Sequence, residues 1–267
     1  MTTVSIYADL YRYRELFANL FRRDLQTRYK GSALGVVWSL VNPLAQMGIY
    51  VLVFSVLLKT AGFAHFPLYL VAGLTVWIFF STSLTAAARS LVASGPLVTK
   101  VRFPRQLVPF SVVATQLVTY AAMLVVLIVV DLAVIPKTRH TFLLSIPISL
   151  LVIALVAGVS LAVACANVVF RDVEHLVGVI LLPWFFLTPI IYRLDGLPGG
   201  LDHHWVVQIL RWGNPLTPSI EALRAPLFYG HVPRWTDVLY LVVAAVVALA
   251  AGAWVFNRVD DRIAVEL

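Results

Sequence analysis

Long apolar segments dominate this sequence and limit what it can fold into. Segments without any Asp, Glu, Lys or Arg lie at residues 33–58, 66–88, 107–130, 142–170, 176–192 and 238–256. A helix needs about 20 apolar residues, and at least roughly 17, to cross the hydrocarbon layer of a membrane. Inside that layer the backbone must satisfy its own hydrogen bonds, so a spanning segment must be helical. The pattern predicts an all-α integral membrane protein with six transmembrane helices. The fifth is only just long enough, and Pro183 and Pro189 predict that it is kinked or partly re-entrant.

The composition favours one membrane domain at residues 31–267, preceded by a cytoplasmic segment at residues 1–30. Hydrophobic residues make up 61% of the chain and charged residues only 12%, which is far from the composition of soluble domains. The net charge of +7 does not indicate nucleic-acid binding, because the basic residues lie at the ends of apolar segments rather than in one stripe. The single cysteine, Cys165, excludes an intrachain disulfide.

The positions of lysine and arginine predict the orientation, because short loops rich in these residues stay in the cytoplasm. With the amino terminus inside, the short outer loops hold only Lys59, Lys137 and Arg139 of the 20 basic residues. Both termini are then cytoplasmic. Four more basic residues, Arg193, Arg211, Arg224 and Arg234, lie in the long connection between the fifth and sixth segments.

The beginning of the chain is amphipathic. Apolar and aromatic residues recur at helical spacing from Ile6 to Leu25, which predicts a helix lying in the membrane interface. A helix that packs on a soluble partner is the alternative. Arg28 and Lys30 follow, directly before the first long apolar segment, so the chain is expected to leave an anionic lipid surface and enter the bilayer there.

Two further stretches predict short helices outside the regular spans. Between residues 193 and 237, apolar clusters separated by prolines predict two re-entrant helices in the outer leaflet, with a folded external cap as the alternative. Between residues 94 and 105, Pro96 and Pro104 bracket one or two basic helical turns on the cytoplasmic side. That short helix either anchors a turn or docks on a partner, and composition alone leaves both open.

Amide and aromatic side chains repeat every four positions along the first apolar segment. They are Trp38, Asn42, Gln46, Tyr50 and Phe54. Each step of four drifts by about 40° on a helix with 3.6 residues per turn, so they form a sloping ribbon. Amides and aromatic rings suit a sugar chain, which offers hydroxyl groups and apolar ring faces. The ribbon predicts the lining of a conduit, to which Trp184 and Phe185 contribute, and ordinary helix packing with interfacial aromatics is the alternative.

Several kinds of chemical site are absent from the sequence. No Gly-x-x-x-x-Gly-Lys-Ser/Thr motif occurs, so any ATP that drives this protein, with its Mg²⁺, is expected on another chain. The histidines lack the spacing of metal ligands, and no nucleophile elbow occurs. We therefore expect no catalytic residue, no metal and no cofactor on this chain. Asp131 is the one candidate intramembrane acid, and its place at the end of a segment argues against a proton- or sodium-coupled carrier.

Small residues recur every four positions in two of the apolar segments. They are Ala154, Gly158, Ala162 and Ala166, and then Ala244, Ala248 and Gly252. Small side chains let helix backbones approach closely in a membrane. The spacing predicts tight helix–helix contacts, either within one protomer or between protomers.

Several short motifs are spread along the chain. They are Arg23-Asp24 with Arg28-Tyr29, Ser32-x-Leu34-Gly35-x-x-Trp38 with Pro43, Phe170-Arg171-Asp172-Val173, Leu187-Thr188-Pro189-Ile190-Ile191-Tyr192, Asn214-Pro215 and Glu221-Ala222-Leu223-Arg224. With these motifs the chain resembles, over almost its whole length, the transmembrane subunits of bacterial ABC-2 polysaccharide exporters. Such subunits move O-antigen, capsule or teichoic-acid polymers.

The resemblance implies an inner-membrane exporter made of two copies of this chain and two ATP-binding cassette subunits, with a lipid-linked glycan as substrate. It implies that Ile6–Leu25 is an interface helix and that residues 201–229 form an external gate. It implies a coupling helix at residues 95–105, whose contacts with the ATPase are Val98, Lys100, Arg102, Phe103 and Arg105. It implies an inner gate at Arg28, Tyr29, Lys30, Gly31, Ser32 and Gly35. A homodimer also suits the size of the chain, because six helices are too few to surround a glycan alone.

Two other functions stay open at this point. An ABC-2 exporter of small lipophilic drugs or lipids would share the fold but would not need a sugar-compatible ribbon. A membrane-embedded transferase acting on a lipid-linked sugar would need catalytic carboxylates, and Asp172 and Glu174 are the only close acidic pair at an inner loop. The sequence does not identify the polymer or its lipid anchor.

Overall fold

The structure is a computed structural model that describes residues 3–29, 37–57, 64–100, 103–194 and 204–266. Within these ranges every regular element is a helix, which confirms the all-α prediction. Four helical stretches are long and apolar enough to cross a membrane, at Phe66–Ala93, Leu107–Val134, Phe142–Val169 and Trp235–Asp260. Two shorter apolar stretches, Val41–Phe54 and Val173–Leu187, coincide with the predicted first and fifth spans. A count of six spans stays a prediction.

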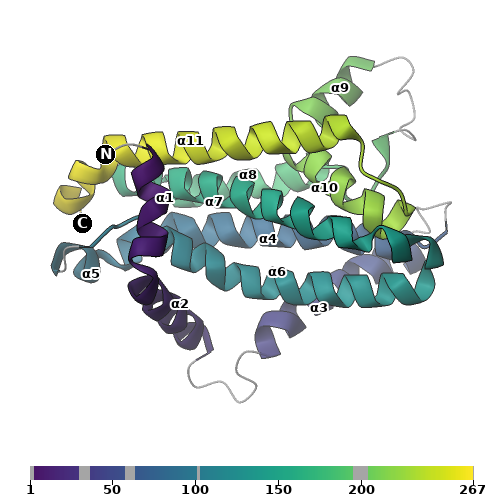
Figure 1. Cartoon of the computed structure of the whole chain (residues 1–267), viewed down its shortest axis with the longest axis horizontal. Coiled ribbons are helices and arrows are strands. Elements are labelled where there is room, and N and C mark those ends of the chain that lie inside the picture. Colours follow the sequence, from purple (N-terminus) through teal and green to yellow (C-terminus); the bar gives the residue numbers. More distant parts are fainter. Residues whose placement is uncertain (1–2, 30–36, 58–63, 101–102, 195–203, 267) are drawn as a thin grey trace.

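The long helices run side by side along the long axis of the molecule (Figure 1). They are α4 (Phe66–Ala93), α6 (Leu107–Val134), α7 (Ser145–Val169) and α11 (Trp235–Glu266). Two short 3₁₀ turns, Pro136–His140 and Phe142–Leu144, join α6 to α7. The shorter helices are α3 (Trp38–Val51), which continues as a π-helix over Leu52–Leu57, and α8 (Val173–Leu187). Pro43 lies inside α3 and Pro183 inside α8.

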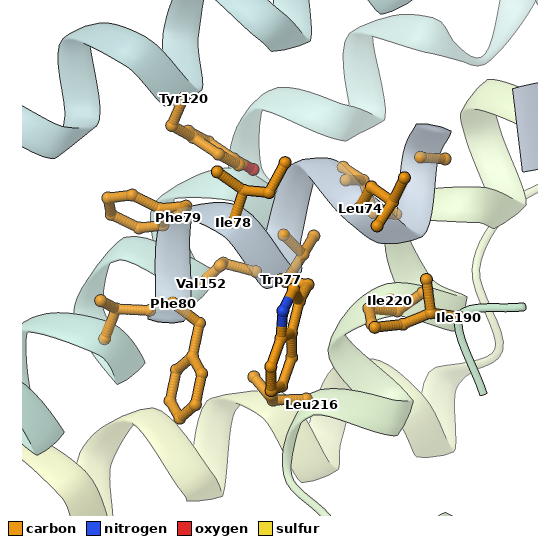
Figure 2. Close-up of a cluster of buried hydrophobic side chains, with 14 of the residues drawn as sticks. Leu74, Trp77, Ile78, Phe79, Phe80, Tyr120, Val152, Ile190, Leu216 and Ile220 are labelled. Atoms are coloured by element: carbon orange, nitrogen blue, oxygen red, sulfur yellow. The ribbon is translucent and has the colours of Figure 1, made fainter. Parts of the chain in front are cut away.

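Helix α4 is the centre of the bundle, because it packs on α6, α7, α8 and α10. All residues from Ala72 to Phe80 are buried, so this stretch is covered on every side, as expected for a helix that is apolar all round. Figure 2 shows its side chains pointing to different partners, with Trp77 directed toward Leu216 and Phe79 toward Tyr120. The ring centroids of Phe79 and Tyr120 are 4.7 Å apart.

Helices α7 and α11 approach each other most closely, because neither carries a large side chain at the crossing. A Cβ atom on Gly252 would lie 2.5 Å from the carbonyl oxygen of Gly158, and one on Gly158 would lie 2.5 Å from the backbone nitrogen of Leu249. Neither position has room for a side chain. The predicted close contact between the small-residue segments is confirmed, and it lies within one chain.

The amino-terminal segment differs from the single helix expected over Ile6–Leu25. Two helices occupy it, α1 (Thr3–Arg12) and α2 (Arg14–Tyr29), and they meet at Tyr13. The backbone hydrogen bonds continue through this point, from Tyr13 N to Asp9 O at 2.8 Å and from Phe17 N to Tyr13 O at 2.9 Å. The helix bends because its halves pack on different partners, α1 on α11 and α2 on α6.

The two ends of the bundle carry different short helices (Figure 1). One end holds α1, α5 (Gly95–Lys100) and the last turns of α11, and we call it the α5 end. The opposite end holds α9 (His204–Trp212), α10 (Leu216–Arg224) and a π-helical turn at Ala225–Tyr229, and we call it the α9 end. The two short helices predicted between the fifth and sixth segments are therefore present. Helix α10 lies buried among α4, α7 and α11, whereas Trp205 and Ile209 of α9 are exposed.

Candidate functional site

The predicted conduit ribbon separates into two parts in the structure. Trp38, Asn42 and Gln46 are exposed along the first turns of α3. Tyr50 and Phe54 are partly buried, their rings stack with centroids 6.1 Å apart, and Phe54 lies in the π-helical continuation of α3. Such π-helical stretches are rare and often lie at functional sites. A conduit role for the ribbon stays a prediction.

The two predicted conduit aromatics of α8 pack toward α3 and α4. Phe185 is buried, and its ring centroid lies 5.4 Å from that of Tyr50 and 5.4 Å from that of Trp77. Trp184 lies against Phe80 at 5.1 Å, and its Nε1 donates a hydrogen bond of 3.0 Å to Oδ1 of Asn214. These contacts join the ribbon residue Tyr50 to α8 and, through Asn214, to the segment before α10. The structure thus brings Tyr50, Trp184 and Phe185 into one aromatic cluster.

The predicted inner gate lies mostly beyond what the structure describes. Arg28 and Tyr29 are the last residues of α2. Lys30, Gly31, Ser32 and Gly35 lie outside the described residues. The gate therefore stays a prediction.

The predicted coupling segment forms the helix α5, with Val98 and Lys100 in its last turn. Arg102 lies outside the described residues. Phe103 is partly buried and packs on the apolar cluster at the α5 end. Arg105 donates hydrogen bonds from Nη1 to the carboxylate of Asp260, at 3.0 Å, and to the Asp260 carbonyl oxygen. Of the five predicted coupling residues, Arg105 thus ties this segment to the end of α11.

Two side chains that the sequence did not single out extend this connection. Gln106 is 1% exposed, and its Nε2 donates a hydrogen bond of 2.9 Å to the Asp9 carboxylate on α1. Ser111, one turn into α6, donates a hydrogen bond of 2.8 Å to the Asp24 carboxylate on α2. The residues that follow α5 are therefore bonded to both halves of the bent amino-terminal helix.

A third group of polar contacts joins α4, α7 and the start of α8. Asn167 donates from Nδ2 to the carbonyl oxygen of Ala88 at 2.8 Å, and its Oδ1 accepts the backbone N–H of Glu174 at 2.9 Å. The Glu174 carboxylate forms an ion pair of 2.7 Å with Arg89 near the end of α4. This pairing engages one of the two acidic groups that a transferase site at this loop would need.

At the α9 end, Arg224 is fully buried and holds three segments together. Its guanidinium donates to the backbone carbonyls of Tyr69 (3.2 Å), Pro189 (2.7 Å) and Ile190 (2.8 Å), and to the Glu221 carboxylate at 2.8 Å. The guanidinium carbon also lies 3.5 Å from the centre of the Tyr69 ring. A buried charge is tolerated only when it is paired and hydrogen-bonded, and Arg224 meets both conditions.

Beside Arg224 lies a cavity of about 230 Å³, which we call the α10 pocket. The guanidinium groups of Arg193, Arg211 and Arg234 and the carboxylates of Glu221 and Asp237 line it. Arg211 Nη2 donates to the Asp237 oxygens at 3.0 and 3.4 Å, and Glu221 is bonded to Arg224. Both carboxylates of the wall are therefore already paired, and three arginines against two carboxylates give the wall an excess of positive charge.

Aromatic rings form the rest of the pocket wall. Tyr229 and His231 stack with centroids 5.5 Å apart and planes 5° apart, and the Arg193 guanidinium carbon lies 5.9 Å from the Tyr229 ring centre. Tyr69 closes the wall on the side of α4. The pocket thus combines flat aromatic surfaces with hydrogen-bond donors and acceptors.

The sequence contained a signal for this arrangement. In the orientation predicted from the sequence, the connection between the fifth and sixth segments is an outer loop, where arginine is disfavoured, yet it holds four arginines. The structure gathers them at the α9 end, three in the wall of the α10 pocket and the fourth, Arg224, buried beside it. Exceptions to the rule that cluster in one connection therefore indicated a site.

Comparisons with known proteins agree with this architecture. Residues 15–228 match the family described as ABC-2 type transporter. The chain is 33% identical over 263 residues to the O-antigen export system permease protein RfbA of Myxococcus xanthus, covering 98% of both chains. It is 28% identical over 251 residues to a protein of the same name from Klebsiella pneumoniae, covering 94% of both. It is 23% identical over 248 residues to the polysialic acid transport protein KpsM of Escherichia coli, covering 91% of this chain and 92% of that protein. With a match across most of its length, the chain belongs to the ABC-2 type transporter family.

Proposed function

We propose that this chain is the membrane-spanning subunit of an ATP-driven exporter that moves a lipid-linked polysaccharide, such as O-antigen, outward across the bacterial inner membrane. The observation that carries the proposal is the similarity to an O-antigen export permease along 98% of both chains. Helices α4, α6, α7 and α11 provide the membrane framework. The absence of a phosphate-binding Gly-Lys motif from the sequence agrees with ATP and Mg²⁺ bound by a separate partner.

The proposed assembly contains two copies of this chain and two ATP-binding cassette subunits. The α5 end faces the cytoplasm in this arrangement, so both termini are cytoplasmic and α5 docks on the partner. The α9 end then faces outward and includes the external gate. The bonds of Arg105 to Asp260 and of Gln106 to Asp9 give α5 a physical connection to α11 and α1, through which a movement of the partner reaches the bundle.

The proposal is tested by ATP hydrolysis in proteoliposomes that contain the chain and its ATP-binding partner. Lipid-linked glycan is expected to stimulate hydrolysis and to be moved outward, whereas small lipophilic drugs are not. Trp38→Ala, on the exposed part of α3, is expected to lower glycan-stimulated export at least several-fold, because the sugar loses an aromatic contact. The matched control is Trp254→Ala, since Trp254 is exposed on α11 at the α5 end. Stimulation by drugs without stimulation by glycan would overturn the proposal.

A further inference from the structure

The α10 pocket has a composition that structural packing alone does not require. Arg224, which is buried, already bonds α10 to α4 and to the segment that follows α8. Arg193 and Arg234, in contrast, line the pocket and are exposed. Arginines in an outer loop do not help to orient a membrane protein, because the positive-inside rule favours basic residues in cytoplasmic loops. Arg193 contacts the Tyr229 ring, so Arg234 in particular is not accounted for by the contacts that hold the fold together.

The charges of the wall favour an anion. Asp237 is 3% exposed and is neutralised by Arg211, and Glu221 is neutralised by Arg224. Among the described residues, no ion pair involves Arg234. A concave site with an excess of one charge concentrates ions of the opposite sign. Guanidinium groups in particular match carboxylate and phosphate groups, to which they donate in a fixed planar geometry.

The aromatic side chains of the wall favour a ligand in which the anionic group is attached to a ring. Tyr229 and His231 form a stacked pair of flat rings. In the part of the chain that the structure describes, Arg224 bonds one oxygen of Glu221, and the other oxygen can accept a hydrogen bond from a ligand hydroxyl. The volume of about 230 Å³ is below the roughly 300–1,000 Å³ of pockets for drug-sized ligands. The space therefore suits one sugar ring rather than several.

The geometry points to the α10 pocket as a binding site for a single acidic sugar unit, a pyranose ring that carries a carboxylate or phosphate group. Arg234 and Arg193 bind the anionic substituent, and Tyr229 and His231 contact the ring. The inference deepens the proposed function, on which it rests for the source of the sugar. In the exporter, the pocket holds a unit of the polymer or its sugar-phosphate end at the outer end of the bundle.

The test is a binding titration with the purified full chain in phosphatidylcholine nanodiscs, followed by saturation-transfer difference NMR. The probes are methyl glucuronide, the neutral methyl glucoside and acetate, which carries the charge without the ring. Methyl glucuronide is expected to bind at least tenfold more tightly than either of the other two. Raising the salt concentration is expected to weaken binding of the glucuronide and to leave the glucoside unchanged. Glucose 1-phosphate and inorganic phosphate form the corresponding pair for a phosphate substituent.

Variants assign the binding to the pocket. Arg234→Gln is expected to lower the affinity for methyl glucuronide about tenfold, to that of the glucoside, and Tyr229→Leu is expected to weaken both sugars. The matched control is Arg139→Gln, at the same end of the bundle but outside the pocket, where Arg139 donates a hydrogen bond to the Leu132 carbonyl. Equal binding of glucuronide, glucoside and acetate, or no binding of any probe, would overturn the inference. So would an unchanged affinity in Arg234→Gln.

The titration separates this inference from the proposed function because it requires no ATP and no partner subunit. Glycan-stimulated ATP hydrolysis without binding of any probe would overturn the sugar-binding role of the α10 pocket and support the proposed exporter function. Probe binding without glycan-stimulated ATP hydrolysis would overturn the proposed exporter function and support the α10 pocket as a sugar-binding site.

Discussion

The two ends of the bundle are held together by different kinds of polar contact. At the α5 end the ion pairs are partly exposed, with side-chain exposures of 23% and 35% for Arg105 and Asp260. At the α9 end Arg224 is 0% exposed and has four oxygen acceptors. Water can replace a partner in the first case, so those pairs break at little cost, about 0–1 kcal/mol for a typical exposed pair. Breaking the contacts of Arg224 would leave a charge unpaired in an apolar interior.

The difference indicates which end is built to change its contacts. The partly exposed ion pairs of the α5 end rearrange more readily, which suits a region that receives movement from a partner. The α9 end keeps α4, α8 and α10 in a fixed relation, and the α10 pocket forms on that fixed part. The predictions below test this contrast by removing contacts from each end.

The largest effect is expected for Arg224→Met, because the substitution leaves three carbonyl oxygens and Glu221 without their donor. The expected loss is about 3–5 kcal/mol, a large part of a typical stability of roughly 5–15 kcal/mol. We expect the variant to accumulate poorly or to unfold about 10 °C below the wild type, measured by thermal unfolding in detergent. Arg139→Met, on an exposed turn of the same end, is the control and is expected to unfold like the wild type. An unchanged unfolding midpoint for Arg224→Met would show that the buried contacts of the α9 end are no more stabilising than the exposed ion pairs of the α5 end.

A smaller effect is expected for Gly73→Ala, which tests the fit of Arg224 against α4. A Cβ atom at position 73 would lie 2.6 Å from Arg224 Nη2 and 3.2 Å from Cγ2 of Ile190. The variant is expected to lose about 1–3 kcal/mol through overpacking. Gly178→Ala is the control, since a Cβ on Gly178 of α8 meets nothing within 4 Å. In an Arg224→Ala background the cost of Gly73→Ala should shrink, and an undiminished cost would show that the clash lies elsewhere.

The features that could be predicted from the sequence are those that depend on neighbouring residues. The long apolar segments became α4, α6, α7 and α11, because segment length and hydrophobicity decide whether a helix can span. The spacing of Gly158 and its neighbours predicted close packing, because residues four apart share one helix face. The short helix between Pro96 and Pro104 was found as α5 for the same local reason.

The remaining features depend on partners that are distant in the sequence. Arg224 donates a hydrogen bond to the carbonyl oxygen of Tyr69, which lies 155 positions earlier in the sequence, and nothing near either residue indicates the pairing. Gln106 bonds to Asp9 across 97 positions. The bend at Tyr13 also follows from packing on two helices, which amphipathic spacing does not specify. Among the predicted site residues, Trp38, Asn42 and Gln46 are exposed in the single chain, and their role in a conduit stays a prediction.

The smallest effect on stability, with a separate effect on function, is expected for Gln106→Leu at the α5 end. The substitution removes one hydrogen bond, to Asp9, and should cost about 1 kcal/mol, so the unfolding midpoint should move by only a few degrees. If the bonds that follow α5 carry movement from the partner to α1, the polymer exported per ATP hydrolysed should fall although hydrolysis continues. The measurement is the ratio of export to hydrolysis in proteoliposomes, with Gln26→Leu on the exposed surface of α2 as the matched control. A normal ratio in Gln106→Leu would show that the α5 end transmits movement through Arg105 and Asp260 or through packing alone, and it would restrict the contrast between the two ends to their stability.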